Sequence, residues 1–385
     1  MAKTNNDHTG VKRAPTHQRR RRIHTKLRVA GLAMLALVLA FGSTATTMYA
    51  NLQKRITQHV IEEYIIATDR PTENQAPLDQ KDGQPINILV LGTDIEVEGS
   101  MRSDTAMIVH ISAGRDRLDV VSIPRDTLVH IPPCVLGDGS RSSHQFDAMF
   151  NSAFDTGTWR GGNVATAATC SLQTVEDLTG IYIDGFIVLN FDSFKTVVDI
   201  LGGIEMCFTE DINDRDAQIT LDAGCHVLDG EQALAVARMR GSVGDGSDIG
   251  RISRQHQVVT AILDTVFADG LLSDPAQLYS LLGSVTPYLD MSEGIGDIQW
   301  LAGLAYSLRN IEKENVNFMT MPFVYVGPRV APAYSAQKVW QALINDEPVP
   351  ESALVADIAP PIIINATEEE ITEFVGAVGS GVETG

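Results

Sequence analysis

The sequence predicts an α/β domain in which helices cover a central β-sheet, and the pattern of apolar residues is what indicates it. Short apolar runs that end in glycine or polar residues alternate with stretches in which apolar residues recur at helical spacing. This alternation is typical of layered α/β folds. The composition, 44% hydrophobic and 20% charged, is that of an ordinary globular protein and argues against wholesale disorder, a collagen-like chain or a coiled-coil rod.

The predicted elements follow one another from residue 86 onward. The run INILVL at Ile86–Leu91 stops at Gly92 and predicts a buried strand. The other predicted strands are Thr105–Ser112, Leu118–Ile123, Gly185–Asn190, Ile204–Phe208 and Val316–Met321. The predicted helices are Asn163–Thr179, Phe191–Leu201, Leu228–Ala237, Ile249–Phe267 and Asp297–Arg309. We find no internal repeat in the sequence.

The first 50 residues predict a membrane anchor. Residues 1–28 form a basic tail with nine Lys and Arg residues and one acidic residue, Asp7. Residues 29–50 carry no charge, and about 20 apolar residues suffice for a transmembrane helix. Because basic residues flank a span on its cytoplasmic side, we expect a single-pass cell-membrane protein with a cytoplasmic N-terminus and an extracellular domain. The alternative is a cleaved signal peptide.

Beyond the span we divide the chain into three parts. Residues 51–85 predict a stalk and linker, in which Asn51–Ala67 forms a short amphipathic helix and Thr68–Pro85 is polar. Residues 86–345 predict the extracellular domain, and residues 346–385 predict an acidic, mostly disordered tail. The net charge of −20 argues against a nucleic-acid partner, because nucleic-acid binders carry a basic face.

Four cysteines lie on the predicted outer side, an even number that suits two disulfides. They are Cys134, Cys170, Cys207 and Cys225. Three pairings are open, and we favour Cys134–Cys170 with Cys207–Cys225 because each pair closes a loop within one stretch of the fold. The sequence has no Cys-x-x-Cys pair, so a zinc ribbon or a thioredoxin-like motif is unsupported. The alternative is four buried free thiols.

Outside the basic tail, 15 arginines accompany five lysines. The planar guanidinium matches phosphate oxygens at two points, which an ammonium cannot do, so this preference favours a phosphate ligand. Two arginines stand where predicted strands begin or end, which is where α/β folds place ligands: Arg102 and Arg125. Asp94 and Asp104 lie beside Arg102 in sequence, and they either share a Mg²⁺ or are simple turn and strand-opening residues.

Two further clusters lie at helix ends. Arg238 and Arg240 share a face only in extended chain, so a helix that presents both to one ligand ends near Ala237. Arg251 and Gln255 are four residues apart and share one face near the start of the next helix, where free N–H groups favour an anion. The alternative for this helix start is an ordinary solvated polar face.

Other chemistries lack their motifs. The sequence has neither a Gly-x-x-x-x-Gly-Lys-Ser/Thr loop for nucleotides nor a Gly-x-Ser-x-Gly elbow for a nucleophilic serine. The histidines of the outer part are scattered and show no metal-ligand spacing. A P-loop enzyme and a serine hydrolase of the elbow type therefore fit the sequence less well.

Taken in order, the charged clusters resemble the LytR-CpsA-Psr family of Gram-positive cell-wall assembly proteins. The matching segments are ILVLGTD, MRSDTAMIV, VVSIPRDT, NSAF, TVEDLTGIYIDGFIVLNFDSFKTVVDILGGIEM, LDGEQALAVARMR and DIGRISRQ. They cover about Ile86–Phe267, close to half of the chain. The single-pass anchor with the domain outside also resembles this family, and the four cysteines resemble an arrangement seen in its actinobacterial members. The loop IEVEGSM after Asp94 departs from the family, because it lacks the extra arginine that many members carry there.

The resemblance implies an α/β/α sandwich with a central mixed sheet and a long apolar pocket for a polyprenyl chain. It implies a phosphotransferase that moves a glycopolymer from a polyprenyl-pyrophosphate carrier to peptidoglycan and forms a phosphodiester. By motif position, Asp94 and Asp104 would hold Mg²⁺, with Mn²⁺ as the alternative. The residues that would bind the pyrophosphate are Arg102, Arg125, Arg238, Arg240, Arg251 and Gln255. Arg125 and Asp104 are the expected catalytic residues, and Asp104 and Asp248 are the candidates for the base.

Two other functions stay open at this point. The domain could bind the polyprenyl phosphate without catalysis, as a regulator, or it could hydrolyse the same lipid with water as the acceptor. The presence of both Asp94 and Asp104 favours catalysis, and a regulator acting on DNA would need its domain in the cytoplasm. The glycopolymer that is moved, the general base and the oligomeric state are also open.

Overall fold

The computed structural model describes residues 60–61, 70–72, 74–75, 78, 81–94, 101–239 and 248–353. Among these residues, none of the helices is both long and apolar enough to cross a membrane. The predicted basic tail and membrane span, residues 1–50, lie outside the described ranges. The same holds for residues 354–385 of the predicted C-terminal tail.

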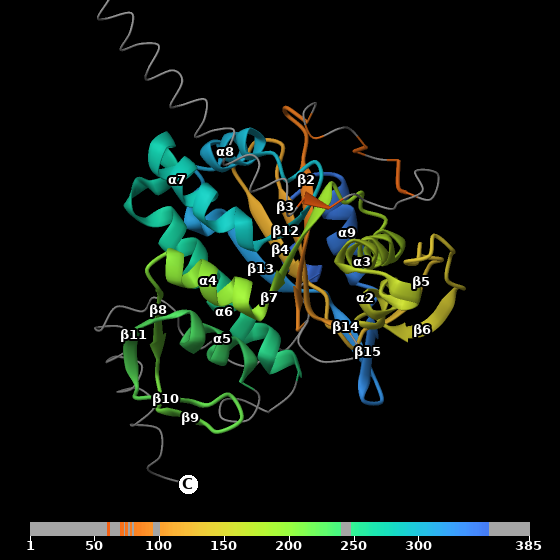
Figure 1. Ribbon diagram of the computed structural model, residues 1–385, viewed down its shortest axis with the longest axis horizontal. Helices are drawn as coiled ribbons and strands as arrows, with labels where there is room; N and C mark the ends of the chain where they lie inside the picture. Colours follow the sequence, from red (N-terminus) through yellow and green to blue (C-terminus); the bar gives the residue numbers. More distant parts are fainter. Residues whose placement is uncertain are drawn as a thin grey trace, which may run out of the picture. The chain divides into compact units, whose positions relative to one another are not determined.

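The described strands form one mixed sheet of seven strands at the centre of the domain (Figure 1). Their order across the sheet is β1 (Val60–Ile61), β12 (Asp290–Ser292), β7 (Gly185–Asn190), β2 (Ile86–Thr93), β3 (Ser103–Ile111), β4 (Leu118–Ser122) and β13 (Val316–Thr320). β2 runs parallel to β7, and β4 runs parallel to β13. β3 lies between β2 and β4 and is antiparallel to both. The central mixed sheet confirms the expected fold class.

Strand β1 falls in the range where we expected the stalk helix. Val60 and Ile61 instead pair in parallel with β12 at the edge of the sheet. Both residues are β-branched, which suits a strand better than a helix. The prediction of a helix is therefore wrong for these two residues, and its other residues, 51–59 and 62–67, lie outside the described ranges.

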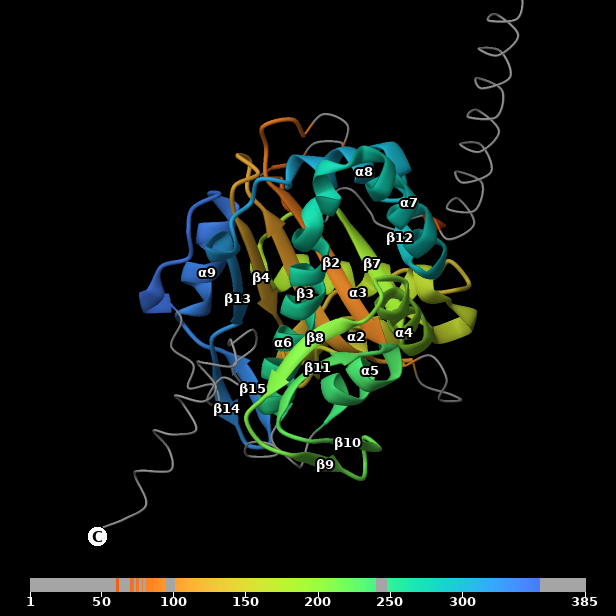
Figure 2. The ribbon, with the colours of Figure 1, turned by 90° about the vertical axis from the view of Figure 1, so that its left-hand side faces the viewer.

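Helices cover both faces of the sheet (Figures 1 and 2). The helices on one side are α2 (Ser152–Gly157), α3 (Val164–Thr179) and α9 (Ala336–Ile344). The helices on the other side are α4 (Phe191–Ile200), α5 (Gly230–Arg238), α6 (Asp248–Phe267), α7 (Pro275–Val285) and α8 (Ile298–Ser307). The sheet is thus the middle layer of three.

Alternate residues of the central strands face two different surroundings. Leu89 and Ile108 are paired across β2 and β3, and both are fully buried in the core cluster beneath α3 and α9. The next pair, Val90 and Met107, lines a cavity on the opposite face. Because successive strand residues point to opposite sides, one face of the sheet is filled by side chains while the other borders a hollow.

Capping residues set the ends of the helices. α3 begins after Asn163, whose side chain accepts two hydrogen bonds from backbone N–H groups of the first turn. It ends at Gly180, where φ is 72°, a left-handed conformation that glycine adopts without steric cost. Asp229 and Asp297 cap α5 and α8 in the same way as Asn163 caps α3. These helices begin within two residues of their predicted starts.

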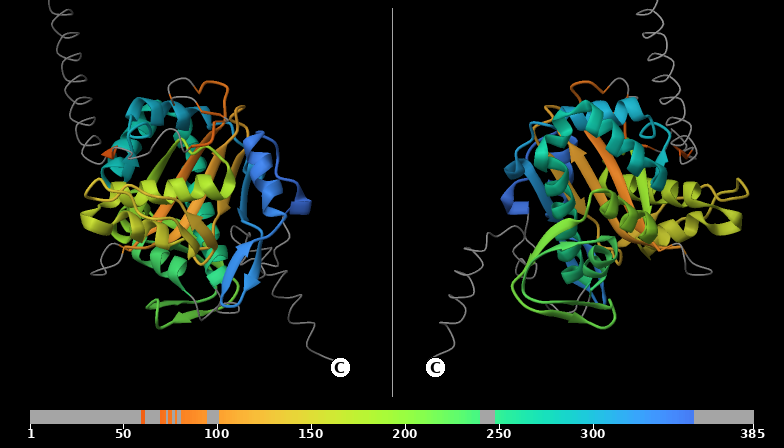
Figure 3. Two further views of the ribbon diagram at one scale, coloured as in Figure 1. Left: turned by 90° about the vertical axis from the view of Figure 1, so that its right-hand side faces the viewer. Right: turned by 60° about the vertical axis from the view of Figure 1, so that its left-hand side comes forward.

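Four two-stranded units and several short 3-10 helices surround the described sheet (Figure 3). The paired strands are β5 (Leu128–Ile131) with β6 (Gln145–Met149), β8 (Ile204–Phe208) with β11 (Gly224–Leu228), β9 (Ile212–Asp214) with β10 (Ile219–Leu221), and β14 (Phe323–Val326) with β15 (Arg329–Pro332). The 3-10 helices are η3 (Trp159–Gly161), η4 (Ala268–Ser273), η5 (Thr286–Tyr288), η6 (Lys313–Asn315) and η7 (Glu351–Ala353). Of the paired strands, β8 is the one that we predicted.

Both disulfides are the ones favoured from the sequence. Cys134–Cys170 joins the segment after β5 to α3, and Cys207–Cys225 joins β8 to β11. All four cysteines lie in described residues and none is free, so the alternative of four buried thiols is wrong.

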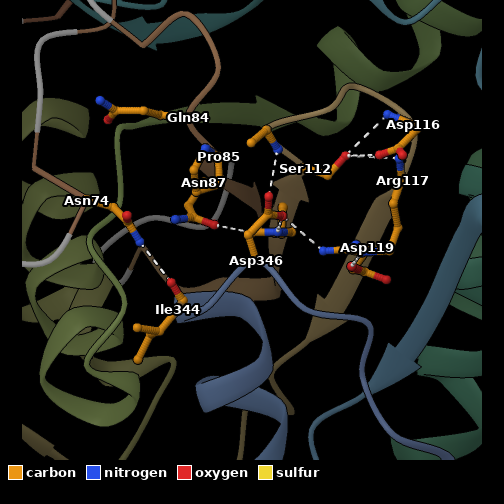
Figure 4. A network of polar contacts seen from close by, with 12 residues as sticks. Asn74, Gln84, Pro85, Asn87, Ser112, Asp116, Arg117, Asp119, Ile344 and Asp346 are labelled. Atoms are coloured by element: carbon orange, nitrogen blue, oxygen red, sulfur yellow. Dashed lines mark hydrogen bonds and ion pairs between the residues drawn. The ribbon is translucent and has the colours of Figure 1, made fainter.

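A polar network holds the end of α9 against the sheet (Figure 4). Asp346 accepts hydrogen bonds from Nη2 of Arg117 at 2.9 Å and from the N–H of Ala113 at 3.0 Å, and Nε2 of His110 lies 3.1 Å from its carboxylate. Burial opposes ionisation of Asp346, but the hydrogen bonds and the positive charges of these partners outweigh it, so its pKa is lowered. Ala353, further along, is fully buried. Residues 346–353 therefore belong to the folded domain, which corrects the predicted start of the disordered tail.

Two basic residues of the predicted linker are anchored in the domain. Lys81 is buried, and its Nζ lies 2.6 Å from Oδ1 of Asp184. Arg70 pairs with Glu176 of α3 at 2.8 Å, and its guanidinium lies over the ring of Tyr182. Both ion pairs are shielded from water, so the described part of this segment packs against the domain.

Candidate active site

The site lies where β2 ends and β3 begins. The pairing of these strands changes register between Gly92 and Thr93, a bulge that redirects the chain. A Cβ atom at Gly92 would lie only 3.1 Å from Cβ of Thr105 on the neighbouring strand, so the close approach of the two strands favours glycine. Asp94 follows β2, Asp104 is the second residue of β3, and both carboxylates line the same two cavities.

The first of these, here called the charged cavity, has a volume of about 500 Å³. Its lining residues are Asp94, Arg102, Asp104, Arg125, Asp126, Met149 and Asn151. Nη1 of Arg125 donates a hydrogen bond to Oδ1 of Asp104 at 2.8 Å. The two side chains are 21% and 37% exposed, so each is partly shielded yet open to the cavity. Four residues predicted from three sequence segments, Asp94, Arg102, Asp104 and Arg125, thus meet in one place.

The backbone on either side of Arg125 is fixed by hydrogen bonds. The Arg125 carbonyl accepts from the N–H of Asn151 at 3.0 Å. Thr127 closes a turn onto the carbonyl of Pro124 with its N–H at 3.0 Å and its hydroxyl at 2.6 Å. Asp126 adds a carboxylate 3.7 Å from Nε of Arg125. The guanidinium is therefore held in place before any ligand binds, which is the condition for effective electrostatic stabilisation.

The second, here called the apolar cavity, has a volume of about 460 Å³ and lies between the sheet and helices α4, α5 and α6. Its apolar lining includes Val90, Met107, Phe191, Phe194, Val258 and Ile262. Asp94 and Asp104 line this cavity as well, so the two cavities adjoin at the two carboxylates.

Helix α6 presents polar and apolar residues of the apolar cavity on one face. Arg251 and Gln255 lie in its first turns, and Val258 and Ile262 continue the same face at helical spacing. Arg251 is buried, and its Nη2 donates to the backbone carbonyl of Asp104 at 3.2 Å. At Arg251, the alternative of a solvated helix start is therefore wrong.

Arg238 is the last residue of α5 and also lines the apolar cavity. Its guanidinium lies over the ring of Phe191, 4.5 Å from the ring centroid. Met239 then leaves the helix with extended backbone angles, and Arg254 of α6 holds this bend by donating from Nε and Nη2 to the Met239 carbonyl. The helix ends one residue later than predicted. Arg240 and residues 241–247 lie outside the described ranges.

The described residues contain no group of three His, Cys, Asp or Glu side chains that could hold a metal ion. The two carboxylates at the junction of the cavities are nevertheless a fitting donor set for Mg²⁺, which is often bound by one or two carboxylates and completes its shell with water and phosphate oxygens. The hydrogen bond from Arg125 uses Oδ1 of Asp104 and leaves the second oxygen of that carboxylate for an ion.

Sequence reasoning missed a contact that joins helix α6 to strand β4. Nε2 of His256 on α6 lies 2.7 Å from Oγ of Ser122, at the end of β4. Burial lowers the pKa of His256 to about 4, so the imidazole is neutral at physiological pH. The contact ties α6, which carries Arg251, to the strand that leads into Arg125. It joins residues far apart in sequence, and no local pattern announces it.

A mixed sheet with an apolar cavity, joined at two carboxylates to a cavity lined by arginines, defines a protein suited to a ligand with an apolar chain and an anionic head. The comparison with protein families agrees with this description. The model of the LytR_cpsA_psr family matches residues 45–345. The chain belongs to this family.

Named relatives include proteins of cell-wall synthesis. The "Probable cell wall biosynthesis protein LcpB" of Corynebacterium glutamicum is 30% identical over 286 residues, which cover 73% of this chain and 61% of LcpB. The chain thus spans about three-fifths of the length of that relative. The polyisoprenyl-teichoic acid–peptidoglycan teichoic acid transferase TagU of Oceanobacillus iheyensis is 29% identical, with 74% of this chain and 79% of TagU covered. The crystal structure of B. subtilis TagV is similar with a TM-score of 0.53 and 26% identity, covering 69% of this chain and 99% of that chain.

Proposed function

We propose that this chain is a membrane-anchored phosphotransferase that moves a glycopolymer from a polyprenyl-pyrophosphate carrier to peptidoglycan during cell-wall assembly. The junction of the two cavities carries the proposal. The apolar cavity suits the polyprenyl chain, the charged cavity suits the pyrophosphate, and Asp94 and Asp104 line both. The relatives named for cell-wall biosynthesis and for teichoic acid transfer support the same reading.

The arginines supply the positive charge that an anionic ligand needs in an acidic protein. The chain has a net charge of −20, so an anionic pyrophosphate is repelled unless local positive charge offsets the field. The residues proposed to bind it are Arg102, Arg125, Arg238, Arg251 and Gln255, with Arg240 as a further member from the sequence motif. Guanidinium groups hold phosphate oxygens at two points each, which also orients the ligand.

The proposed reaction is a displacement at phosphorus. A hydroxyl oxygen of the acceptor attacks the phosphorus atom that bears the glycan, and a new P–O bond forms there. The bond from this phosphorus to the oxygen that bridges the two phosphates breaks, so polyprenyl phosphate leaves and the glycan is joined to the acceptor by a phosphodiester. The hydroxyl proton passes to a base. Such a transfer depends mainly on alignment and charge neutralisation.

Arg125 is the residue that we propose acts most directly on the reacting phosphates. Its hydrogen bond to Asp104 and its fixed backbone hold the guanidinium without reorganisation during the reaction. Asp104 orients Arg125 and is also a candidate to accept the hydroxyl proton, with Asp248 as the other candidate. Asp94 and Asp104 would together hold Mg²⁺, or Mn²⁺ in its place. When bound, such an ion would neutralise phosphate charge.

The proposed location follows from the predicted anchor. Residues 29–50 would span the cell membrane, with the basic tail in the cytoplasm and the domain outside. An extracellular domain has the disulfides expected of an oxidising compartment, and this one has two.

Transfer should be measured with the full chain in detergent, with Mg²⁺, a polyprenyl-pyrophosphate-linked glycan and peptidoglycan fragments. We expect Arg125→Ala and Asp104→Ala to lower turnover by about 100-fold or more, because each removes a group that acts on the transition state. Arg329→Ala, at an exposed position of β15, should leave turnover unchanged. Circular dichroism checks that all three variants are folded.

The products separate this proposal from its two competitors. Accumulation of a free glycan phosphate in the presence of acceptor would identify a hydrolase of the same lipid and reject transfer. Tight binding of the carrier without turnover, weakened only in affinity by the two variants, would identify a binding protein without catalysis.

A further inference from the structure

A group of stacked aromatic rings lies on the β5–β6 hairpin, outside both cavities. It consists of His130 in β5, Phe146 in β6 and His144 just before β6. The planes of the three rings lie within 17° of one another, and their centroids are 4.7 to 6.0 Å apart. Phe146 is 73% exposed. We call these three side chains the aromatic platform.

Hydrogen bonds hold the aromatic platform rigid. Nδ1 of His130 lies 2.9 Å from Oδ2 of Asp177 on α3, and Nε2 of His130 lies 2.9 Å from Nδ1 of His144. This chain of contacts joins the two imidazoles edge to edge and fixes their planes. A surface that is already ordered loses little entropy when a ligand binds, so the arrangement favours recognition.

The aromatic platform and Arg125 belong to one continuous set of backbone contacts. Phe146 precedes Met149, a residue of the charged cavity, by three positions, which is about 10 Å at the rise of a strand. The N–H of Phe150 donates to the Thr127 carbonyl, and the N–H of Asn151 donates to the Arg125 carbonyl. A glycan of two or three rings that lies on Phe146 is therefore long enough to span the distance from Phe146 to Met149.

Asn151 offers such a ligand a hydrogen-bond acceptor inside the charged cavity. It is 3% exposed and directly precedes α2, yet its side chain does not cap that helix. Among the residues that the structure describes, its Oδ1 has no hydrogen-bond partner. A buried acceptor without a donor is costly, so the position is suited to a hydroxyl supplied by a ligand.

We propose that the aromatic platform is a subsite for one pyranose ring of a glycan, and that Asn151 receives a hydroxyl of the same glycan. The C–H groups of a sugar ring pack against an aromatic face, whose negative charge density attracts them. The exposed apolar area is essentially one ring, far less than the roughly 1,000 Å² of a specific protein interface. This inference rests on the proposed function, in which the glycan belongs either to the peptidoglycan acceptor or to the carrier-linked donor.

The subsite is tested by measuring the affinity of the full chain in detergent for each glycan. This measurement does not require turnover. The probes are purified peptidoglycan strands and the carrier-linked glycopolymer. We expect Phe146→Leu, which keeps an apolar side chain but loses the flat face, to bind one of them about three- to tenfold more weakly. Phe146→Trp restores a flat face and should bind as the wild type does. Tyr334→Ala removes another highly exposed aromatic residue and should have no effect.

A second experiment uses Asn151→Ala, which should bind the same glycan about tenfold more weakly. Melting temperatures check that this variant is folded. The probe whose binding is weakened, either the peptidoglycan strand or the carrier-linked glycopolymer, identifies the source of the sugar. Unchanged binding of both glycans by Phe146→Leu would overturn the proposal, as would a loss shared by Phe146→Trp or Tyr334→Ala. Transfer could still fail in the Arg125 assay while Phe146 governs glycan binding, so the two proposals fail separately.

Discussion

His256 and Ser122 show that residues outside both cavities connect the elements that form the site. The imidazole of His256 lies between the Ser122 hydroxyl and the ring of Phe318, on the buried side of α6. A charged imidazole has little to compensate it there, which is why burial lowers its pKa to about 4 from the ordinary 6.5. The neutral form is therefore the one that joins α6 to β4.

This histidine makes a prediction about stability. Between pH 6.5 and 4 the unfolded chain binds a proton at His256 that the folded protein does not. The free energy of unfolding should therefore fall as the pH drops through this window, by up to about 1.4 kcal/mol per pH unit. Urea unfolding at several pH values measures the slope. His256→Gln should flatten it, and an unchanged slope in this variant would contradict the assignment.

Helix α6 shows how one element serves two cavities. Its first turns present Arg251 and Gln255, and the same face continues with Val258 and Ile262. A single stripe thus changes from cationic and polar to apolar along the helix. A ligand with an anionic head and an apolar chain can lie along this stripe in one orientation, so the helix sets the direction of binding as well as its chemistry.

The apolar end of this stripe can be tested with Ile262→Trp. A tryptophan there fills part of the apolar cavity and excludes the far end of a long carrier chain. We expect KM to rise about tenfold for long-chain carriers, since two excluded CH2 groups cost about 0.8 kcal/mol each. The same variant assayed with a short-chain carrier analogue is the control. An equal rise for both carriers would show that residue 262 does not meet the chain.

The helices and strands that were predicted correctly are those whose apolar pattern is long or ends at clear polar or glycine residues. β7 and β8 match their predicted ranges, because each is an apolar run closed by polar or glycine residues. The β5–β6 unit was missed because β5 has four residues and its pairing is irregular between Val129 and Ile131. Helix α2 has six residues, too few for a helical period to be visible.

The charged half of the site was predictable and the rest only in part. Asp94, Asp104 and Arg125 stand at strand ends, where a parallel or mixed sheet gathers ligand-binding groups, and they do line one cavity. The apolar stripe after Gln255 is visible in the spacing of α6 and could have been read from it. The Ser122–His256 contact could not be predicted from the sequence, because it depends on the packing of residues 134 positions apart. The roles assigned to these residues, and Arg240 altogether, stay predictions.

At the scale of the whole molecule, the two disulfides close loops of different length in different parts of the chain. Cys134–Cys170 closes a sequence separation of 36 residues, and Cys207–Cys225 closes one of 18. A cross-link stabilises mainly by limiting the unfolded chain, and its effect grows slowly with the length of the closed loop.

Removing each disulfide by a pair of Cys→Ala substitutions should lower the free energy of unfolding by about 2–5 kcal/mol. The pair Cys134 and Cys170 should cost about 0.6 kcal/mol more, because its loop is twice as long. Denaturant unfolding of both variants and the wild type measures the difference. A clearly larger loss from the shorter loop would show that local packing, rather than chain entropy, decides the contribution.

The network in Figure 4 also fastens the segment that enters the domain. Nδ2 of Asn74 donates to the carbonyl of Ile344, so the segment entering the domain is fastened directly to the end of α9, and Asp346 continues the fastening to Arg117. In the membrane-anchored protein that we propose, tension arriving through the entering segment would pass first to α9 and to the start of β2. Gly92 and Asp94 lie at the other end of β2, about 25 Å away at the rise of a strand. In the membrane-anchored protein that we propose, the reacting groups thus lie at the opposite end of β2 from the point where the entering segment is fastened.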